Sequence, residues 1–277
     1  MHNISKERHM FKHILIAVDF SPAWPLLRQR LEKLTAWGTK RVTLMYVLST
    51  RYPASPQETH RTHYEAKLAD LASELATSAL SIESQVRSGE PGAVIAEAAQ
   101  ELNADLVLMG CRGYSRWHEF FLGSTALDAA RLTQRPLWLE PVTENQGSRD
   151  FRLMILATDG SQAVTGAEEM AGKLAAHFQR SLAVAAACAS EGCDREIEDA
   201  QRHLNTLAEQ IEGLETRILD GNPRNVITAE ADREAADLVV IGKRGRNRIH
   251  EFLLGSTAEN IARDAHCPVL VVPSKPE

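Results

Sequence analysis

Two glycine-bearing segments have the residue types and the spacing of an anion-binding corner. One of them reads Gly242-Lys243-Arg244-Gly245, then nine residues, then Gly255-Ser256-Thr257. Because glycine has no Cβ, its backbone N–H groups can approach a ligand closely. A helix that starts after such a loop presents free N–H groups and the positive end of its dipole, which suits a phosphate. The segment therefore predicts a phosphate site where a loop meets a helix.

The same pattern occurs earlier in the chain, as Gly110-Cys111-Arg112-Gly113, nine residues, and Gly123-Ser124-Thr125. Between residues 110–140 and 242–272, 15 of 31 positions are identical. One match would be a weak signal, but two at the same spacing, each between an apolar run and a helical pattern, indicate a tandem duplication.

The elements around these segments alternate between strand and helix in both repeats. Near-continuous apolar runs predict buried parallel strands. The predicted strands cover 12–18, 42–47, 82–86, 105–109 and 136–139, and then 152–158, 182–187, 214–218, 237–241 and 268–272. The predicted helices cover 58–80, 91–102 and 124–133, and then 194–211, 223–235 and 256–265, with one more after each first strand, N-capped by Ser21 or Ser161. This alternation predicts two doubly wound parallel sheets.

In a doubly wound sheet, ligands bind beyond the carboxyl ends of the strands, where the strand order reverses. Asp19 and Asp159 follow the first strands, and Gly110 and Gly242 end the fourth strands. If those strands are neighbours, the acidic residue and the glycine loop face one crevice. Read alone, each aspartate could equally be a turn residue, but the glycine loops favour contact with a ligand.

Other polar side chains near the loops leave two interpretations open. Arg112 and Arg244 either neutralise a phosphate or are solvated surface charges. The repeated pairs His118-Glu119 and His250-Glu251 lack the His-Glu-x-x-His pattern of a zinc enzyme, so a structural role is favoured.

Length and composition narrow the class of protein. At 277 residues, two domains are expected, and we place them at 1–143 and 150–277 with a polar linker at 144–149. The net charge of −6 argues against general binding of nucleic acid. No apolar run reaches the length of a membrane span, and residues 1–10 have no signal-peptide core, so a cytoplasmic protein is expected. The four cysteines have no zinc spacing and are expected to be reduced, with Cys111 a packing residue rather than a reactive thiol.

The chain resembles the universal stress protein family. The resemblance covers nearly the whole chain and depends on Gly-x2-Gly-x9-Gly-Ser in both repeats, Asp-x-Ser after each first strand, and a final strand led by proline. This glycine spacing resembles the nucleotide-binding branch of the family. The resemblance implies the strand order 3-2-1-4-5 in each repeat, and pairing through the last strand, so that the tandem chain is pseudo-dimeric. A homodimer of the tandem chain is a further expectation.

The resemblance also implies which residues bind a nucleotide such as ATP, ADP or AMP, with Mg²⁺ or Mn²⁺ held by the phosphates and by no protein side chain. In the second repeat these residues are Ala157, Thr158, Asp159, Ala187, Ile241, Gly242, Arg244, Gly245, Gly255, Ser256 and Thr257. In the first repeat they are Asp19, Val47, Met109, Gly110, Arg112, Gly113, Gly123, Ser124 and Thr125. The aspartate and the end of the second strand would contact adenosine. The Gly-Ser-Thr that ends each motif would hold the phosphates.

The second repeat matches the family pattern better than the first. It has Ser256 and Glu259 at the spacing of a capping box, where the first repeat has Leu127 in place of the glutamate. The first repeat also has Phe20, Trp138 and a longer loop after its second strand. A nucleotide is therefore favoured more strongly in the second repeat.

Three functions of different classes follow from these observations. The leading hypothesis is a regulatory stress-response protein that binds ATP-type or AMP-type nucleotides. The second is a slow ATPase or phosphotransferase, although no Gly-x4-Gly-Lys-Ser/Thr occurs and no catalytic residue is assigned. The third is a scaffold whose crevices are vestigial and bind no nucleotide.

Overall fold

The chain divides into two compact units: Met1–Trp117 and Gly123–Val142 belong to the first, and His118–Leu122 and Thr143–Glu277 belong to the second. The computed structural model describes residues 10–50, 60–77, 79–111, 122–141, 151–187, 194–245 and 253–274. Within that part of the chain, no helix is both long and apolar enough to cross a membrane. Each unit is described by itself.

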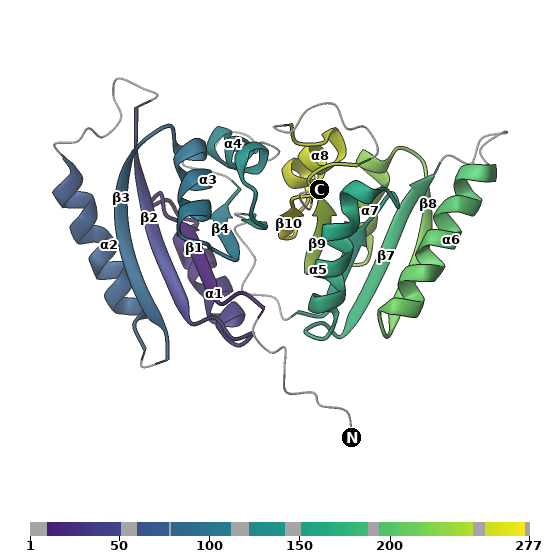
Figure 1. Cartoon of the computed structure of the whole chain (residues 1–277), viewed down its shortest axis with the longest axis horizontal. Helices are drawn as coiled ribbons and strands as arrows, with labels where there is room; N and C mark the ends of the chain where they lie inside the picture. Colours follow the sequence, from purple (N-terminus) through teal and green to yellow (C-terminus); the bar gives the residue numbers. More distant parts are fainter. Residues whose placement is uncertain are drawn as a thin grey trace. The chain divides into compact units, whose positions relative to one another are not determined.

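The first unit is a five-stranded parallel sheet with helices on both faces (Figure 1). Its strands are β1 (His13–Ala17), β2 (Arg41–Ser49), β3 (Ser81–Gly89), β4 (Leu106–Gly110) and β5 (Leu137–Glu140), and its helices are α1 (Trp24–Thr35), α2 (Arg61–Leu75), α3 (Pro91–Glu101) and α4 (Ser124–Leu132). The strand order is β3-β2-β1-β4-β5. Because the chain steps outward to β3 and then returns past β1, right-handed crossovers place α1 and α2 on one face and α3 and α4 on the other.

The second unit repeats this topology. Its strands are β6 (Leu153–Ala157), β7 (Arg180–Ala187), β8 (Leu214–Asp220), β9 (Leu238–Gly242) and β10 (Val269–Val272), and its helices are α5 (Thr165–Ala175), α6 (Asp194–Gln210), α7 (Pro223–Arg233) and α8 (Ser256–Asp264), with a short 3₁₀ turn, η2 (Gln162–Val164), before α5. The strands run parallel in the order β8-β7-β6-β9-β10. The predicted fold class and the order 3-2-1-4-5 are therefore confirmed in both units.

The central strands are apolar because helices cover both of their faces. All five residues of β6 and of β9 are buried, and the two strands pair from Met154 with Leu238 to Ala157 with Ile241. Strands β1 and β4 pair in the same way in the first unit. The first and fourth strands are therefore neighbours at the point where the strand order reverses, as expected.

The edge strand β3 is longer than the five residues predicted for it. It pairs with β2 over nine positions, from Ser81 to Gly89, and most of its side chains are partly or fully exposed. A search for apolar runs underestimates its length, because many of its residues are polar. An edge strand can be polar because backbone hydrogen bonds hold it more than burial does. Helix α2, in contrast, spans Arg61–Leu75 and is shorter than predicted.

The predicted cap of α1 at Ser21 is wrong, because the N-cap of this helix is Ala23. Ser161 is the N-cap of the 3₁₀ turn η2, which leads into α5, but its side chain makes no capping hydrogen bond, and the N-cap of α5 itself is Val164. The serines instead lie in turns formed by the preceding aspartates: the Ser21 N–H donates to Asp19 Oδ1 at 2.9 Å, and the second unit has the same turn. The chain needs this extra turn before it can enter the helix.

The capping box predicted for α8 is also wrong. The N-cap is Gly255, and no side chain caps the helix there. Ser256 is therefore the first helical residue. Glu259 forms an ion pair with Arg263 at 3.1 Å, which is an ordinary i,i+4 pair.

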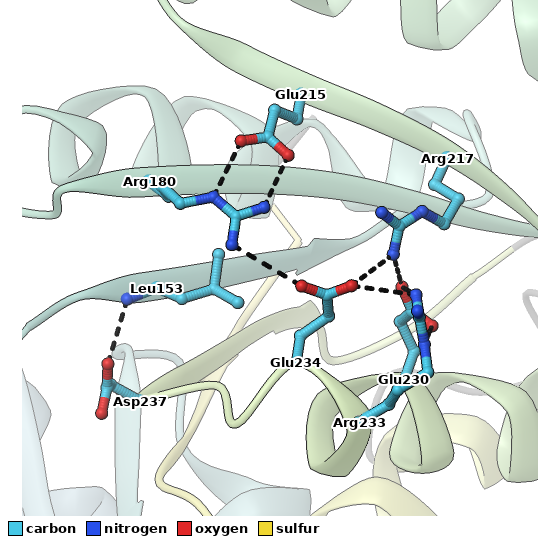
Figure 2. A network of polar contacts seen from close by, with 8 residues as sticks. All are labelled: Leu153, Arg180, Glu215, Arg217, Glu230, Arg233, Glu234 and Asp237. Atoms are coloured by element: carbon cyan, nitrogen blue, oxygen red, sulfur yellow. Dashed lines mark hydrogen bonds and ion pairs between the residues drawn. The ribbon is translucent and has the colours of Figure 1, made fainter.

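An Arg–Glu network joins β7, β8 and α7 at the end of the second sheet opposite to its glycine loops. Its members are Arg180, Glu215, Arg217, Glu230, Arg233 and Glu234, and Figure 2 shows how they alternate in charge. Glu230 is buried and accepts hydrogen bonds from Arg233, at 2.9 and 2.7 Å, and from Arg217. Arg180 donates to both oxygens of Glu215, at 2.9 and 2.8 Å.

The network makes the second unit sensitive to acid. Burial opposes ionisation of Glu230, but hydrogen bonds from Arg233 and Arg217 outweigh it and hold its pKa below the usual 4.5. The unfolded chain then binds protons more readily than the folded one, so the stabilisation is complete above about pH 4.5 and is lost as the pH falls through the lower folded pKa. We expect the backbone amides of β8 and α7 to lose protection from pH 5 to pH 3.5. The protection is measured by hydrogen-exchange mass spectrometry, relative to the intrinsic exchange rate at each pH.

A variant with Glu230→Gln cannot titrate at this position and should lose less protection over the same pH range, starting from a lower stability at pH 7. The exposed Glu198→Gln on α6 is the matched control and should behave as the wild type. Equal acid sensitivity in the wild type and Glu230→Gln would show that the network does not carry the effect.

Candidate functional site

The carboxyl ends of β6 and β9 border a cavity of about 430 Å³ in the second unit. Ten of the eleven residues predicted for this site line it: Ala157, Thr158, Asp159, Ile241, Gly242, Arg244, Gly245, Gly255, Ser256 and Thr257. They come from the ends of β6 and β9, from the loop after β9 and from the first turn of α8. The doubly wound topology thus brings together groups that lie about a hundred residues apart in the chain.

The glycines of the loop are required by close backbone contacts. A Cβ on Gly242 would lie 2.9 Å from a Val164 methyl and 3.0 Å from the Arg244 carbonyl. A Cβ on Gly245 would overlap a carboxylate oxygen of Asp159. The acidic side chain after β6 therefore lies directly against the glycine loop, as the spacing predicted.

Lys243 holds the two ends of the glycine motif together through its backbone. Its N–H donates to the Val272 carbonyl at 2.7 Å, and its carbonyl accepts from the Gly255 N–H at 2.8 Å. Its side chain is buried, and this burial, with the nearby Arg244 charge, lowers the pKa of the ammonium to about 8. The backbone link brings the start of α8 to the end of β9.

The first turn of α8 borders the cavity. Ser256, Thr257 and Ala258 line the cavity, and no side chain caps the helix. The first N–H groups of a helix have no partner within the helix, so they can receive an anion. Nearby, Arg244 Nε and Ser161 Oγ are buried and have no hydrogen-bond partner among the residues that the structure describes. Buried polar atoms without partners are rare, and a ligand's oxygens would satisfy them.

The residue that lines the cavity at the end of β7 is Ala186 rather than the predicted Ala187. Ala157 pairs with Val184, whereas Ala17 of the first unit pairs with Met45, so the connection from α5 to β7 is one residue shorter than that from α1 to β2. Ala186 is therefore the structural counterpart of Val47. A constant offset between the repeats misses this single deletion.

The first unit forms the same backbone corner. The Cys111 N–H donates to the Glu140 carbonyl, and the Cys111 carbonyl accepts from the Gly123 N–H, both at 2.9 Å. Helix α4 also begins after a glycine without a side-chain cap. Of the residues predicted for this site, the structure describes Asp19, Val47, Met109, Gly110, Gly123, Ser124 and Thr125, whereas Arg112 and Gly113 lie outside the described residues.

The turn after β1 differs from its counterpart by an aromatic cluster. Phe20 occupies the position of Gly160 and has the same left-handed backbone, with φ of 57° against 68°. This conformation is uncommon for a bulky residue. The Phe20 ring lies 5.2 Å from Tyr46 and 5.7 Å from Tyr64, and the two tyrosines stack at 4.2 Å. Lys67 lies over the Phe20 ring at 5.2 Å.

Several apolar residues that line the cavity of the second unit were not predicted from the sequence. They are Val164, Pro223, Ile227, Leu253, Leu254 and Ala258. Pro223 and Ile227 begin α7, where the helical spacing marked them only as residues of a packed face. Leu253 is half exposed at 49%, which suits the rim of a cavity. The contribution of Pro223 and Ile227 follows from where α7 lies in the fold, and no local sequence motif indicates it.

Other predicted groups have the following positions. Cys111 and Cys267 are buried cysteines that are not joined in a disulfide. Cys188, Cys193 and the two His-Glu pairs at 118–119 and 250–251 lie outside the described residues. In the described ranges, no three His, Cys, Asp or Glu side chains gather in a way that could hold a metal ion.

The fold and the two glycine corners define a class of tandem α/β proteins, each half a doubly wound parallel sheet. The sequence profile of the universal stress protein family matches residues 10–139 and 150–273. The chain therefore belongs to the universal stress protein family, with two family domains in tandem.

Individual relatives agree with this assignment. A universal stress protein of Methanocaldococcus jannaschii is 30% identical over 143 residues, which cover 46% of this chain and 84% of that protein. One of Thermus aquaticus is 31% identical over 136 residues, covering 44% of this chain and 98% of that protein. The crystal structure of a universal stress protein from Archaeoglobus fulgidus has the same fold, with a TM-score of 0.74 at 19% identity, over 96% of this chain and 97% of that one.

Proposed function

We propose that the second unit binds an adenine nucleotide, ATP or its di- or monophosphate, and that the protein acts as a nucleotide-responsive regulator in a stress response. The observation that carries the proposal is the cavity of about 430 Å³ between Asp159, the glycine loop and the start of α8. Its volume lies in the range of pockets for small ligands and cofactors.

The cavity lining offers two kinds of chemistry. Ala186, Pro223 and Ile227 give an apolar surface that suits a flat base, and Asp159 can accept hydrogen bonds from an amino group or ribose hydroxyls. The N-terminus of α8 and the guanidinium of Arg244 suit a phosphate chain. Arg244 Nε and Ser161 Oγ, which have no hydrogen-bond partner in the described part of the chain, would gain partners from the ligand.

A divalent cation would enter with the phosphates. Mg²⁺ prefers phosphate oxygens and water when few carboxylates are present. Asp159 is the only acidic residue among the described residues that line the cavity. The proposed role of Mg²⁺ or Mn²⁺ is therefore to neutralise the phosphate chain, while the protein contributes Arg244 and backbone N–H groups.

Isothermal titration of the purified chain with ATP, ADP and AMP, each with and without Mg²⁺, tests the proposal. We expect binding with about one nucleotide per chain in the second unit. A titration without heat at millimolar concentrations of all three nucleotides would contradict it. Phosphate release measured in parallel separates a binding protein from a slow ATPase, because an ATPase would consume the ATP it binds.

A further inference from the structure

Behind the cavity, three side chains of the second unit form a hydrogen-bonded row. The Thr158 hydroxyl donates to Glu168 Oε1 at 2.5 Å, and His203 Nε2 lies 2.7 Å from the same oxygen. Since an ionised carboxylate only accepts hydrogen bonds, His203 must carry its proton on Nε2. The three residues come from the end of β6, from α5 and from α6, so they tie two helices to the turn beside the cavity.

This row holds the turn that contains Asp159. The Thr158 hydroxyl also accepts a hydrogen bond from the Gly160 N–H at 3.1 Å. On its other side, Gly160 packs on the imidazole of His203, since a Cβ there would lie 3.1 Å from the ring. Asp159 lies between Thr158 and Gly160 in the chain, and its carboxylate lies against Gly245. The turn that carries the acidic group thus packs on His203, which is itself not among the lining residues given by the described part of the chain.

The first unit lacks the threonine and the glutamate of this row. By the offset that relates β1 and α1 to β6 and α5, Val18 and Arg28 stand where the second unit has Thr158 and Glu168. Arg28 forms an ion pair with Glu32 at 3.3 Å instead. The turn there is covered by Phe20 and its aromatic neighbours.

We propose that Glu168 and His203 are positioning residues for the nucleotide site, which act through Thr158 to hold the turn of residues 158–161 in its binding geometry. This inference rests on the proposed function for the identity of the ligand. Its mechanical part, that the row holds the turn, does not depend on a ligand. A rigid turn binds more tightly because less ordering is required on binding.

The test compares His203→Leu, His203→Gln and the wild type in two measurements. Leucine removes the donor to Glu168, whereas glutamine keeps an N–H that can reach the carboxylate. His266→Leu is the matched control, because His266 also pairs with a carboxylate of the same unit, Asp232 at 3.2 Å, but lies outside the cavity lining. The measurements are amide exchange at Gly160 without ligand, by NMR, and ATP affinity, by titration.

We expect His203→Leu to accelerate exchange at the Gly160 amide and to weaken ATP binding about tenfold, equivalent to about 1.4 kcal/mol. His203→Gln should recover most of both losses, and His266→Leu should change neither. Unchanged exchange and affinity in His203→Leu, with normal binding by the wild type, would overturn the positioning role. If the wild type binds no nucleotide, the proposed function fails, and the exchange measurement alone then decides whether the row holds the turn.

Discussion

Replacing Gly245 by alanine should abolish most nucleotide binding while the second unit stays folded. The added methyl group would overlap the carboxylate of Asp159, so that either the glycine loop or the acidic side chain must leave its place. Both border the cavity, and either movement disrupts the ligand's surroundings. We expect ATP affinity to fall by about a hundredfold, equivalent to about 2.7 kcal/mol, in an isothermal titration.

Gly172→Ala provides the matched control, since it adds the same methyl group to the same unit. Gly172 lies inside α5, and its Cβ would make ordinary contacts of 3.4 and 3.5 Å with Ile211. Alanine at an interior helix position raises stability by up to about 1 kcal/mol and should leave ATP affinity unchanged. Retained ATP affinity in Gly245→Ala would count against a ligand between Asp159 and the loop.

The second large effect concerns the stability of the first unit. Arg30 on α1 donates to both oxygens of Glu140 on β5, at 2.8 and 3.0 Å, and both side chains are buried. The indole N–H of Trp138 donates to the same carboxylate at 2.9 Å. The guanidinium carbon of Arg30 lies over the Trp138 ring, 5.2 Å from its centroid. Removing one partner of such a buried pair leaves an uncompensated charge.

Arg30→Met should therefore lower the free energy of unfolding of the first unit by about 3–5 kcal/mol. All four tryptophans precede Val142, so tryptophan fluorescence during urea unfolding reports on the first unit. The triple change Arg30→Met, Trp138→Leu and Glu140→Val should recover much of this loss, because an apolar replacement of a buried pair is often neutral. If Arg30→Met unfolds at the same urea concentration as the wild type, the pair does not stabilise the unit.

The triple change copies a solution that the chain already contains. In the second unit, Met170, Leu270 and Val272 occupy the positions of Arg30, Trp138 and Glu140. The register supports this equivalence, since Gly110 pairs with Glu140 and Gly242 pairs with Val272. The two units thus fill one place in the same fold with a buried ion pair in one case and with apolar side chains in the other.

The fold was predictable because its signals are local and repeated. Apolar runs, the glycine motifs and the proline-led last strands located nine of the ten strands well, and the duplication allowed each repeat to check the other. The helix starts were not predictable in this way. Ser21, Ser161 and Ser256 have the composition of caps, but the aspartate turns and the glycine before α8 determine where the helices begin.

The candidate site was predictable in its polar part and not in its apolar part. Asp159 and the glycines can be recognised in the sequence because few residue types can fill their positions. The wall formed by Pro223 and Ile227 could be assigned only once α7 was placed beside β7. Glu168 and His203 lie farther from any motif, and only the hydrogen bonds to Thr158 relate them to the cavity.

The backbone corner shared by both units has a consequence for counting ligands in tandem members of this family. Cys111 and Lys243 make equivalent backbone hydrogen bonds, although Phe20 stands in the first unit where Gly160 stands in the second. The described part of the corner is thus the same beside two different turn residues. The number of glycine motifs therefore counts backbone corners in a duplicated chain and does not by itself count bound ligands.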